Sequence, residues 1–200
     1  MPSLCLRGLT MAFGRRLLFT HVEAEVAPGR CLAVTGANGA GKSTLLRIVA
    51  GLLRPEAGSV VFDGARGYAA PDVQAYGELT GVENLTFFAR LRGLPDADMD
   101  GLLARVGLPP ARGRDLVSTY SSGMRQRLKL AVSLLGDPPL LLWDEPTATL
   151  DAAGRGLADS ILERHRAGGG VAVIATNEVA ESERWGDLHL RVGRAERAAS

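Results

Sequence analysis

The chain contains a glycine-rich stretch near its start, Gly36-Ala37-Asn38-Gly39-Ala40-Gly41-Lys42-Ser43-Thr44. It fits the phosphate-loop pattern, in which two glycines flank four residues and precede a lysine and a hydroxyl residue. Before it, Cys31–Thr35 is a short apolar run typical of a buried strand, and residues 44–50 after it are apolar at helical spacing. Such a loop turns its N–H groups, and the positive end of the next helix, toward one anion. The stretch therefore predicts a polyphosphate site.

Lys42 and Ser43 are the residues of this loop that carry side-chain chemistry. A lysine here contacts the β- and γ-phosphates as a point charge, and the following hydroxyl ligates the magnesium ion that bridges them. Lys42 and Lys129 are the two lysines among 23 lysines and arginines. A chain that otherwise uses arginine keeps lysine at this position, which supports the phosphate-loop interpretation.

Length and composition fit one α/β domain over residues 1–200. The 200 residues are 46% hydrophobic, and the formal net charge is only +1, so no nucleic-acid-binding surface is expected. Cys5 and Cys31 lie in apolar stretches and read as buried thiols, as in a reducing compartment. The start lacks a basic segment followed by an apolar core, and no apolar run approaches about 18 residues. We expect a partner to supply any membrane span.

The rest of the chain alternates strand-like and helix-like segments. Phe13, next to a turn, is either an exposed aromatic or a core residue. Strands are expected at Leu4–Phe13, 21–27, 59–63, near 68–70, at Leu140–Asp144, 171–176 and 188–192, and helices at 82–92, 96–106, after Ser122, after Asp151 and after Glu178.

Two acidic residues follow a run of leucines, and they are the second candidate for chemistry. Leu140–Asp144 is apolar throughout, as in a strand of a parallel sheet that is buried on both faces, and Glu145 comes next. The carboxyl ends of such strands are where ligands of open α/β folds bind. Asp144 is suited to hold magnesium through water, and Glu145 to orient the attacking water or accept its proton. The alternative is a solvated turn that carries two acids.

Ser121 and Ser122 stand before a strong helical pattern and are natural N-cap residues. Alone they would indicate only a capped helix. However, the run Ser121-Ser122-Gly123-Met124 lies about twenty residues before Asp144. This spacing, together with the phosphate loop, is specific to one family of nucleotide-binding proteins. From Leu4 to Gly193 the chain resembles the nucleotide-binding subunit of an ATP-binding-cassette (ABC) transporter.

The resemblance implies a P-loop NTPase fold of the ABC type. Its mostly parallel central sheet would be flanked by helices, with an N-terminal antiparallel β-subdomain and a helical subdomain inserted at about 72–138. It implies ATP and Mg²⁺ as ligands. Phe13 would stack on adenine, Gly36 to Thr44 would hold the phosphates, and Ser43 and Asp144 would serve the metal. Glu145 would be the catalytic carboxylate. Ser121, Ser122 and Gly123 would contact the γ-phosphate of an ATP bound to the opposite subunit, and Asp151 would end the loop that communicates across the dimer.

The chain departs from the family pattern at several positions. Pro71 and Asp72 stand where the family usually has glutamine, with Gln74 nearby but out of register. Asn177 replaces the switch histidine. An amide donates to a phosphate oxygen but takes up no proton, so Asn177 would sense the γ-phosphate without acid–base work. In the signature, the differences are Tyr120 for Leu, Ser122 for Gly and Met124 for Gln.

The function that follows is an ATPase subunit whose ATP-driven dimerisation and hydrolysis move a substrate through separate membrane subunits. Its partners would be a second nucleotide-binding subunit and transmembrane permease subunits, which would hold it at the cytoplasmic face of the membrane. The short chain resembles small export-type ATPases, including the haem-exporter ATPase of cytochrome c maturation. Two alternatives stay open: an ATP-gated dimerising module with slow or no hydrolysis, and a soluble ABC protein that acts on ribosomes or DNA.

Overall fold

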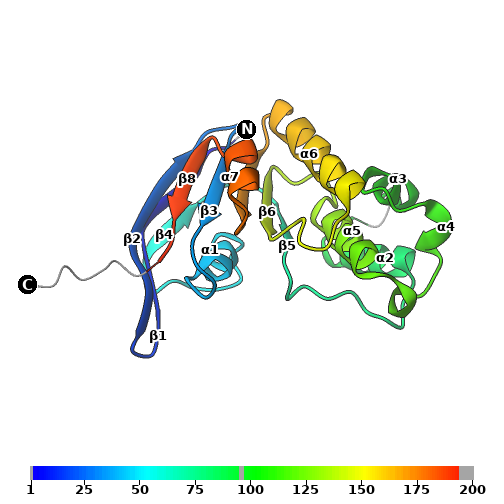
Figure 1. Ribbon diagram of the computed structural model, residues 1–200, viewed down its shortest axis with the longest axis horizontal. Helices are drawn as coiled ribbons and strands as arrows, with labels where there is room; N and C mark the ends of the chain where they lie inside the picture. The colour runs from blue at the N-terminus through cyan, green and yellow to red at the C-terminus, as the bar shows by residue number, and fades with distance from the viewer. Residues whose placement is uncertain (1, 95–96, 194–200) are drawn as a thin grey trace, which may run out of the picture.

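The computed structural model describes residues 2–94 and 97–193 (Figure 1). Its strands and helices follow one another in this order: β1 (Leu4–Phe13), β2 (Arg16–Val26), β3 (Cys31–Thr35), α1 (Lys42–Val49), β4 (Ala57–Val61), β5 (Arg66–Ala69), α2 (Gly81–Leu91), α3 (Met99–Arg105), α4 (Pro110–Gly113), the 3-10 turn η1 (Val117–Thr119), α5 (Ser122–Ser133), β6 (Leu140–Asp144), α6 (Ala152–Ala167), β7 (Val171–Ala175), α7 (Val179–Trp185) and β8 (Leu188–Arg191).

Two sheets organise the molecule. Five strands form a parallel sheet in the order β5-β6-β7-β3-β8, and β1, β2 and β4 form a separate antiparallel sheet in the order β2-β1-β4. The expected mostly parallel sheet with an antiparallel N-terminal part is confirmed. Helices α2 to α5, which we call the helical lobe, come between β5 and β6 in the chain and gather on one side of the molecule (Figure 1).

The parallel sheet is covered on both faces, which explains its unbroken apolar strands. Successive side chains of a strand point to opposite faces. In β6, Leu140 and Leu142 join a core with α1 and the antiparallel sheet, whereas Leu141 and Trp143 join a core with α5 and α6. The Trp143 indole N–H is buried there and donates to the Ser133 hydroxyl at 3.0 Å. The carboxyl ends of the strands are left free to carry a site.

Two strands begin earlier than the sequence predicts. Strand β2 starts at Arg16 rather than at residue 21, because Gly14 adopts a φ of 57° and reverses the chain within two residues. Strand β4 spans Ala57–Val61 rather than 59–63. Its Gly58 has a φ of +86° and approaches the β1 backbone so closely that a Cβ there would lie 2.4 Å from the Arg7 carbonyl oxygen. Only glycine fits this contact between the strands.

The helical lobe also differs from prediction in detail. Helix α3 begins at Met99, because the Asp98 carboxylate accepts the Gly101 N–H at 2.9 Å and caps the helix at that point. The predicted start, Asp96, lies outside the described residues. The short helix α4, which follows Pro109, and the turn η1 were not predicted. Both lie in a segment whose apolar residues are too few to show a period.

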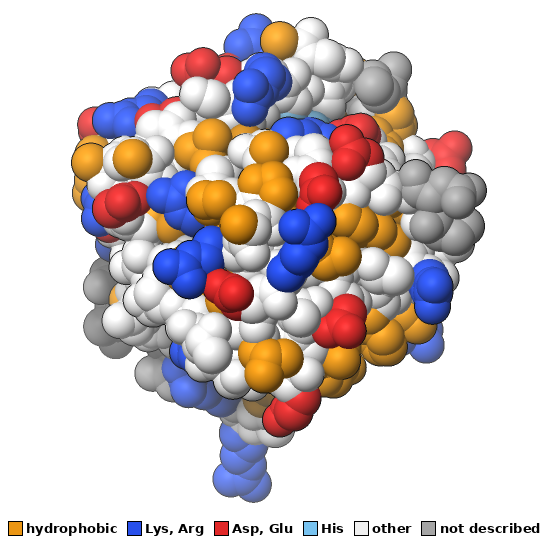
Figure 2. All heavy atoms as spheres, turned by 90° about the vertical axis from the view of Figure 1, so that its right-hand side faces the viewer, with side chains coloured by type: hydrophobic (Ala, Val, Ile, Leu, Met, Phe, Trp, Pro, Cys, Tyr) orange, Lys and Arg blue, Asp and Glu red, His pale blue; other side chains and the backbone are white. Residues whose placement is uncertain are grey.

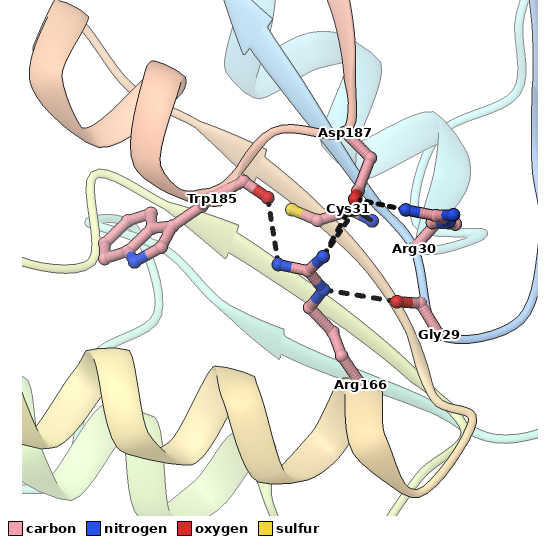
Figure 3. A network of polar contacts seen from close by, with 6 residues as sticks. All are labelled: Gly29, Arg30, Cys31, Arg166, Trp185 and Asp187. Atoms are coloured by element: carbon pink, nitrogen blue, oxygen red, sulfur yellow. Dashed lines mark hydrogen bonds and ion pairs between the residues drawn. The ribbon is translucent and has the colours of Figure 1, made fainter.

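A polar cluster closes the amino ends of the parallel strands (Figure 3). We call it the amino-end clamp and define it by Arg30, Arg166 and Asp187. The Asp187 carboxylate accepts hydrogen bonds from the Cys31 N–H at 2.8 Å, from Arg30 at 2.8 Å and from Arg166 at 2.7 and 2.9 Å. Arg166 also donates to the carbonyl oxygens of Gly29 and Trp185. The clamp therefore joins β3, the end of α6 and the start of β8.

The clamp sets the electrostatics of this end of the sheet. Burial acts to raise the pKa of Asp187, but the Cys31 N–H and the two guanidinium groups outweigh it and hold the pKa below its ordinary value. Burial raises the pKa of the neighbouring Cys31 thiol to about 12. Cys31 is thus a buried, protonated thiol as predicted, whereas Cys5 is only partly buried.

The outer face of the helical lobe mixes apolar side chains with charged ones of both signs (Figure 2). In the described part of the chain, no helix is both long enough and apolar enough to cross a lipid bilayer.

Candidate functional site

The phosphate loop connects β3 to α1 at the carboxyl end of the parallel sheet. Gly36 and Gly41 have φ angles of 149° and 108°, and a Cβ on Gly36 would lie 2.2 Å from the Val192 carbonyl oxygen. Side chains are therefore excluded where the loop turns. Gly41 caps α1 without a side-chain hydrogen bond, so the first N–H groups of the helix receive no capping side chain. The loop offers these donors to an anion.

Lys42 is the first residue of α1, and its side chain is almost fully buried. Its ammonium group donates to the Gly36 carbonyl oxygen at 3.0 Å and to Asn177 Oδ1 at 2.7 Å. Asn177 follows β7, and its Nδ2 donates to Glu145 Oε1 at 2.6 Å and to Asn38 Oδ1 at 3.0 Å. One amide therefore joins the phosphate loop, the end of β6 and the end of β7.

Asp144 and Ser43 are the predicted metal-binding pair, and they lie side by side. Asp144 ends β6 and is 2% exposed. Burial raises the pKa of its carboxyl, and a hydrogen bond from Ser43 and the charge of Lys42 only partly offset this. A carboxylate and a hydroxyl are the oxygen donors that Mg²⁺ prefers, and Mg²⁺ usually keeps water and phosphate as its other ligands. The described residues hold no larger cluster of His, Cys, Asp or Glu suited to a metal.

Glu145 follows Asp144 in a strained backbone conformation. Its φ of 50° is rare for a residue with a side chain, and its N–H donates to the Ala175 carbonyl oxygen at 2.9 Å. Burial raises the pKa of its carboxyl. A hydrogen bond from the Asn177 backbone N–H and the charge of Lys42 oppose that rise, and the charges of Asp144 and Glu181 add to it. The carboxylate is joined to the phosphate loop through Asn177, which bonds both Glu145 and Asn38, rather than lying free in a solvated turn.

Phe13 lies at the end of β1 and is 52% exposed, so of the two alternatives the exposed aromatic is correct. It lines a pocket of about 270 Å³ together with the phosphate loop. Arg16 lines the same pocket and donates to the Gly39 carbonyl oxygen at 2.9 Å. Arg16 was not predicted from the sequence, because its partner lies 23 residues away in the chain and no local pattern marks such a contact.

The signature residues lie elsewhere. The Ser121 hydroxyl accepts the Met124 N–H at 3.2 Å and caps α5, while Ser122 and Gly123 form the first turn of that helix. Helices α1 and α5 lie on opposite sides of β5 and β6 (Figure 1). Two pockets that phosphate-loop residues line in the described structure include none of Ser121, Ser122 and Gly123. Within one chain the two predicted halves of the site are therefore apart.

Asp151 also lies outside the phosphate-loop pocket. Its carboxylate accepts the Gly154 N–H at 2.8 Å and Arg127 Nη2 at 3.0 Å, so it caps α6 and ties it to α5. The hydrogen bond from Gly154 is the main reason that the pKa of Asp151 lies below its ordinary value. Just before Asp151, the Thr149 hydroxyl donates to the Ser122 carbonyl oxygen at 3.4 Å. The loop ending at Asp151 thus packs against the signature helix.

Pro71 and Asp72, which stand where the family usually has glutamine, connect α1 to the helical lobe. Arg47 of α1 donates to the Asp72 carboxylate at 2.8 and 3.1 Å, and Lys129 of α5 donates to the Pro71 carbonyl oxygen at 3.4 Å. The substitution is visible in the sequence, but these two partners are not, because both come from helices distant in the chain.

The chain is similar in sequence and fold to ATP-binding proteins of transporters. The model of the ABC transporter family matches residues 19–148. The chain is 40% identical over 196 residues to the cytochrome c biogenesis ATP-binding export protein CcmA of Methylococcus capsulatus, with 87% of this chain and 90% of that protein covered. It is 31% identical over 192 residues to the lantibiotic transport ATP-binding protein SrtF of Streptococcus pyogenes, covering 92% and 83%. A solved dimeric structure of a bacterial ABC transporter cassette has a similar fold, with a TM-score of 0.83, 22% identity and coverage of 95% and 94%.

Proposed function

Since the chain belongs to the ABC transporter family, we propose that it is an ATPase subunit that drives transport through separate membrane subunits. The observation that carries the proposal is the meeting of Lys42, Asn177 and Glu145 through direct hydrogen bonds, beside Ser43 and Asp144. These groups come from three segments far apart in the chain, and each has a role in phosphoryl transfer.

In this proposal the chain's own residues divide the work. The N–H groups at the start of α1 and the Lys42 ammonium bind the phosphates. Ser43 and Asp144 hold Mg²⁺, which neutralises charge on the phosphate oxygens when bound. Glu145 orients the attacking water and accepts its proton, for which a raised pKa is favourable. Asn177 holds Glu145 and Lys42 in register through hydrogen bonds, and it moves no proton.

The second half of the site would come from another nucleotide-binding subunit. Ser121, Ser122 and Gly123 lie at the start of the capped helix α5. This helix and the phosphate-loop helix α1 lie on opposite sides of β5 and β6 (Figure 1). A head-to-tail dimer would place this helix start against the γ-phosphate of an ATP held by the partner subunit. ATP binding would then close the dimer, and hydrolysis would open it.

An exposed aromatic cluster is the surface that we propose for the permease. Tyr76 lies against Phe87 and Phe88, with ring centroids 5.1 and 6.3 Å away. Tyr76 is 48% exposed and the nearby Leu91 is 68% exposed. The fully buried Asn84 fixes this segment, because its side chain bonds both the N–H and the carbonyl oxygen of Tyr76. The cluster is thus anchored, because Phe88 packs against the core. Tyr76 and Phe87 remain exposed, and an exposed apolar patch of this kind marks an interaction surface.

The cargo follows from similarity alone. A relative named for export in cytochrome c biogenesis matches most of the chain, so we propose export of that kind, with haem as the cargo and the membrane subunits selecting it. Co-purification tests the partner: a Tyr76→Ser, Phe87→Ser double variant is expected to lose the permease and to keep MgATP binding. Retention of the permease by that variant would reject this surface.

A single-turnover assay tests the enzymatic proposal. Wild-type protein in excess over radiolabelled MgATP is expected to cleave it, and Glu145→Gln to cleave it about 10² to 10⁴ times more slowly. Glu183→Gln is the matched control, since Glu183 is an exposed residue of α7. Binding without cleavage by the wild type would favour the slow or non-hydrolysing module instead.

A further inference from the structure

Glu181, on α7, hydrogen-bonds to residues that lie next to Glu145 and Asn177 in the chain. Its carboxylate accepts a hydrogen bond from the Thr176 hydroxyl at 2.7 Å and another from the Thr147 hydroxyl. Thr147 and Thr176 are 2% and 0% exposed, so neither hydroxyl has water as an alternative partner. An ionised carboxylate is an acceptor for both donors at once.

The two threonines flank the two groups that face the phosphate loop. Thr147 comes two residues after Glu145, and Thr176 comes immediately before Asn177. The Thr176 hydroxyl also accepts the Glu178 N–H at 3.0 Å, which fixes the turn that carries Asn177. Glu181 therefore ties the loop after β6 to the loop after β7, at the level where Asn177 meets Glu145 at 2.6 Å.

The signature helix enters the same set of contacts. Gln126 of α5 donates to the Pro146 carbonyl oxygen at 2.9 Å, and Pro146 lies between Glu145 and Thr147. Hydrogen bonds and adjacent residues thus lead from α5 through Pro146 and Thr147 to Glu181, and from there to Thr176 and Asn177. The connection begins at Gln126 on α5 and ends at Thr176, next to Asn177.

We propose that Glu181 is a positioning residue for ATP hydrolysis, which sets the spacing of Glu145 and Asn177 through Thr147 and Thr176. The inference rests on the proposed function. In the described structure Glu181 makes no hydrogen bond to the phosphate loop or to Lys42; its hydrogen bonds are with Thr147 and Thr176. Its loss would leave the ATP-binding groups in place and loosen the loop that carries Glu145. The effect is therefore expected in turnover and not in nucleotide affinity.

Steady-state hydrolysis by the purified chain separates these effects. Glu181→Ala is expected to lower kcat about 10- to 100-fold, since small displacements of positioned groups carry costs of this size. The KM for MgATP should change by less than about threefold. Glu181→Gln keeps the shape but offers one acceptor oxygen instead of two, so we expect a smaller loss of kcat, which also covers the case in which Glu181→Ala does not fold. Glu183→Ala, on the same helix, should change neither constant.

A double-mutant cycle tests the route. If Glu181 acts through the threonines, Glu181→Gln should lower kcat by less than about twofold in a Thr147→Val, Thr176→Val background. Wild-type kcat in both Glu181 variants, equal losses in kcat and affinity, or full additivity with the threonine changes would overturn the positioning role. Failure of the proposed function would give a different result. In that case wild type would cleave no ATP, or Glu145→Gln would be as active as wild type.

Discussion

The two ends of the parallel sheet carry polar clusters that are built for opposite purposes. At the amino end, Asp187 accepts hydrogen bonds from one N–H and two arginines, and its pKa is lowered. At the carboxyl end, Asp144 and Glu145 have raised pKa values, chiefly because burial disfavours their ionised forms. The amino-end clamp is complete within the chain. The carboxyl-end groups lie beside the phosphate loop, where we propose that ATP binds.

Glu145 and the clamp residues also differ in backbone conformation, although strain is not confined to the carboxyl end, since Asp137, just before β6, has a φ of 45°. Glu145 has a φ of 50° beside the phosphate loop, whereas the clamp residues lie in ordinary conformations. Proteins keep strain of this kind where function requires it, and stable contacts elsewhere compensate. We infer that the amino end contributes stability and the carboxyl end contributes chemistry. Substitutions at the two ends should therefore separate these two properties.

The largest expected effect is on turnover at the carboxyl end. Asn177→Ala removes the amide that joins Lys42 to Glu145, so hydrolysis should slow by about 10²-fold. Because Asn177 is exposed, the free energy of unfolding should change by less than about 0.5 kcal/mol. Single-turnover kinetics and urea denaturation of the same sample measure both quantities. A large loss of stability would show that this end also holds the fold together.

The next effect is on stability at the amino end. Asp187→Asn removes the charge that faces Arg30 and Arg166, so the free energy of unfolding should fall by about 2 kcal/mol. For a chain of this length the melting temperature should fall by about 4 to 8 °C. Asp115→Asn is the matched control, because Asp115 forms an exposed ion pair with Arg112. Affinity for MgATP should stay at its wild-type value, and a parallel loss of affinity would break the comparison.

A smaller effect of opposite sign is expected at Asp144. Because the folded protein raises the pKa of this carboxyl, its ionised form weakens the fold at neutral pH. Asp144→Asn should therefore raise the free energy of unfolding, by up to about 1 kcal/mol, while it lowers Mg²⁺-dependent hydrolysis. Thermal denaturation without nucleotide measures the first change. A lower melting temperature would show that Asp144 is already satisfied by Ser43 and Lys42.

The smallest expected effect is the pH dependence of the stability differences between wild type and the variants Asp187→Asn and Asp144→Asn. The Asp187 pKa is lowered from 3.8, so its stabilising contribution is complete above that value and is lost as the pH falls through the folded pKa. The Asp144 pKa is raised from 3.8, so its destabilising contribution appears as the pH rises through that value. In urea denaturation, the stability of Asp144→Asn should approach that of wild type as the pH falls from about 7 toward 3.8. The stability difference of Asp187→Asn should persist over that range and shrink only below 3.8.

The carboxyl end was the more predictable from sequence. The phosphate loop is a local pattern, and the apolar strand before Asp144 and Glu145 places these acids at the sheet edge, so the sequence identified the residues that meet there. The parallel sheet followed from the same runs. Glu181 and Arg16 were missed because their partners lie on other elements, and no local signal marks a contact between distant segments.

The amino-end clamp was missed for the same physical reason. Arg166 and Asp187 are 21 residues apart and Arg30 is 157 residues from Asp187, and each looks like an ordinary surface charge in the sequence. Strand ends were also wrong where one glycine decided them, as at Gly14 and Gly58. Apolar periodicity locates elements, but caps and close backbone contacts set their ends.

The most direct test of the account is the shift in melting temperature that MgATP produces. At about 100 times its dissociation constant, the nucleotide should stabilise wild-type protein by about 2.7 kcal/mol, which is a rise of about 5 to 10 °C. The account predicts the same rise in Asp187→Asn, from a lower starting temperature, and no rise in Lys42→Ala. An unchanged melting temperature in wild type, or a full rise in Lys42→Ala, would contradict it.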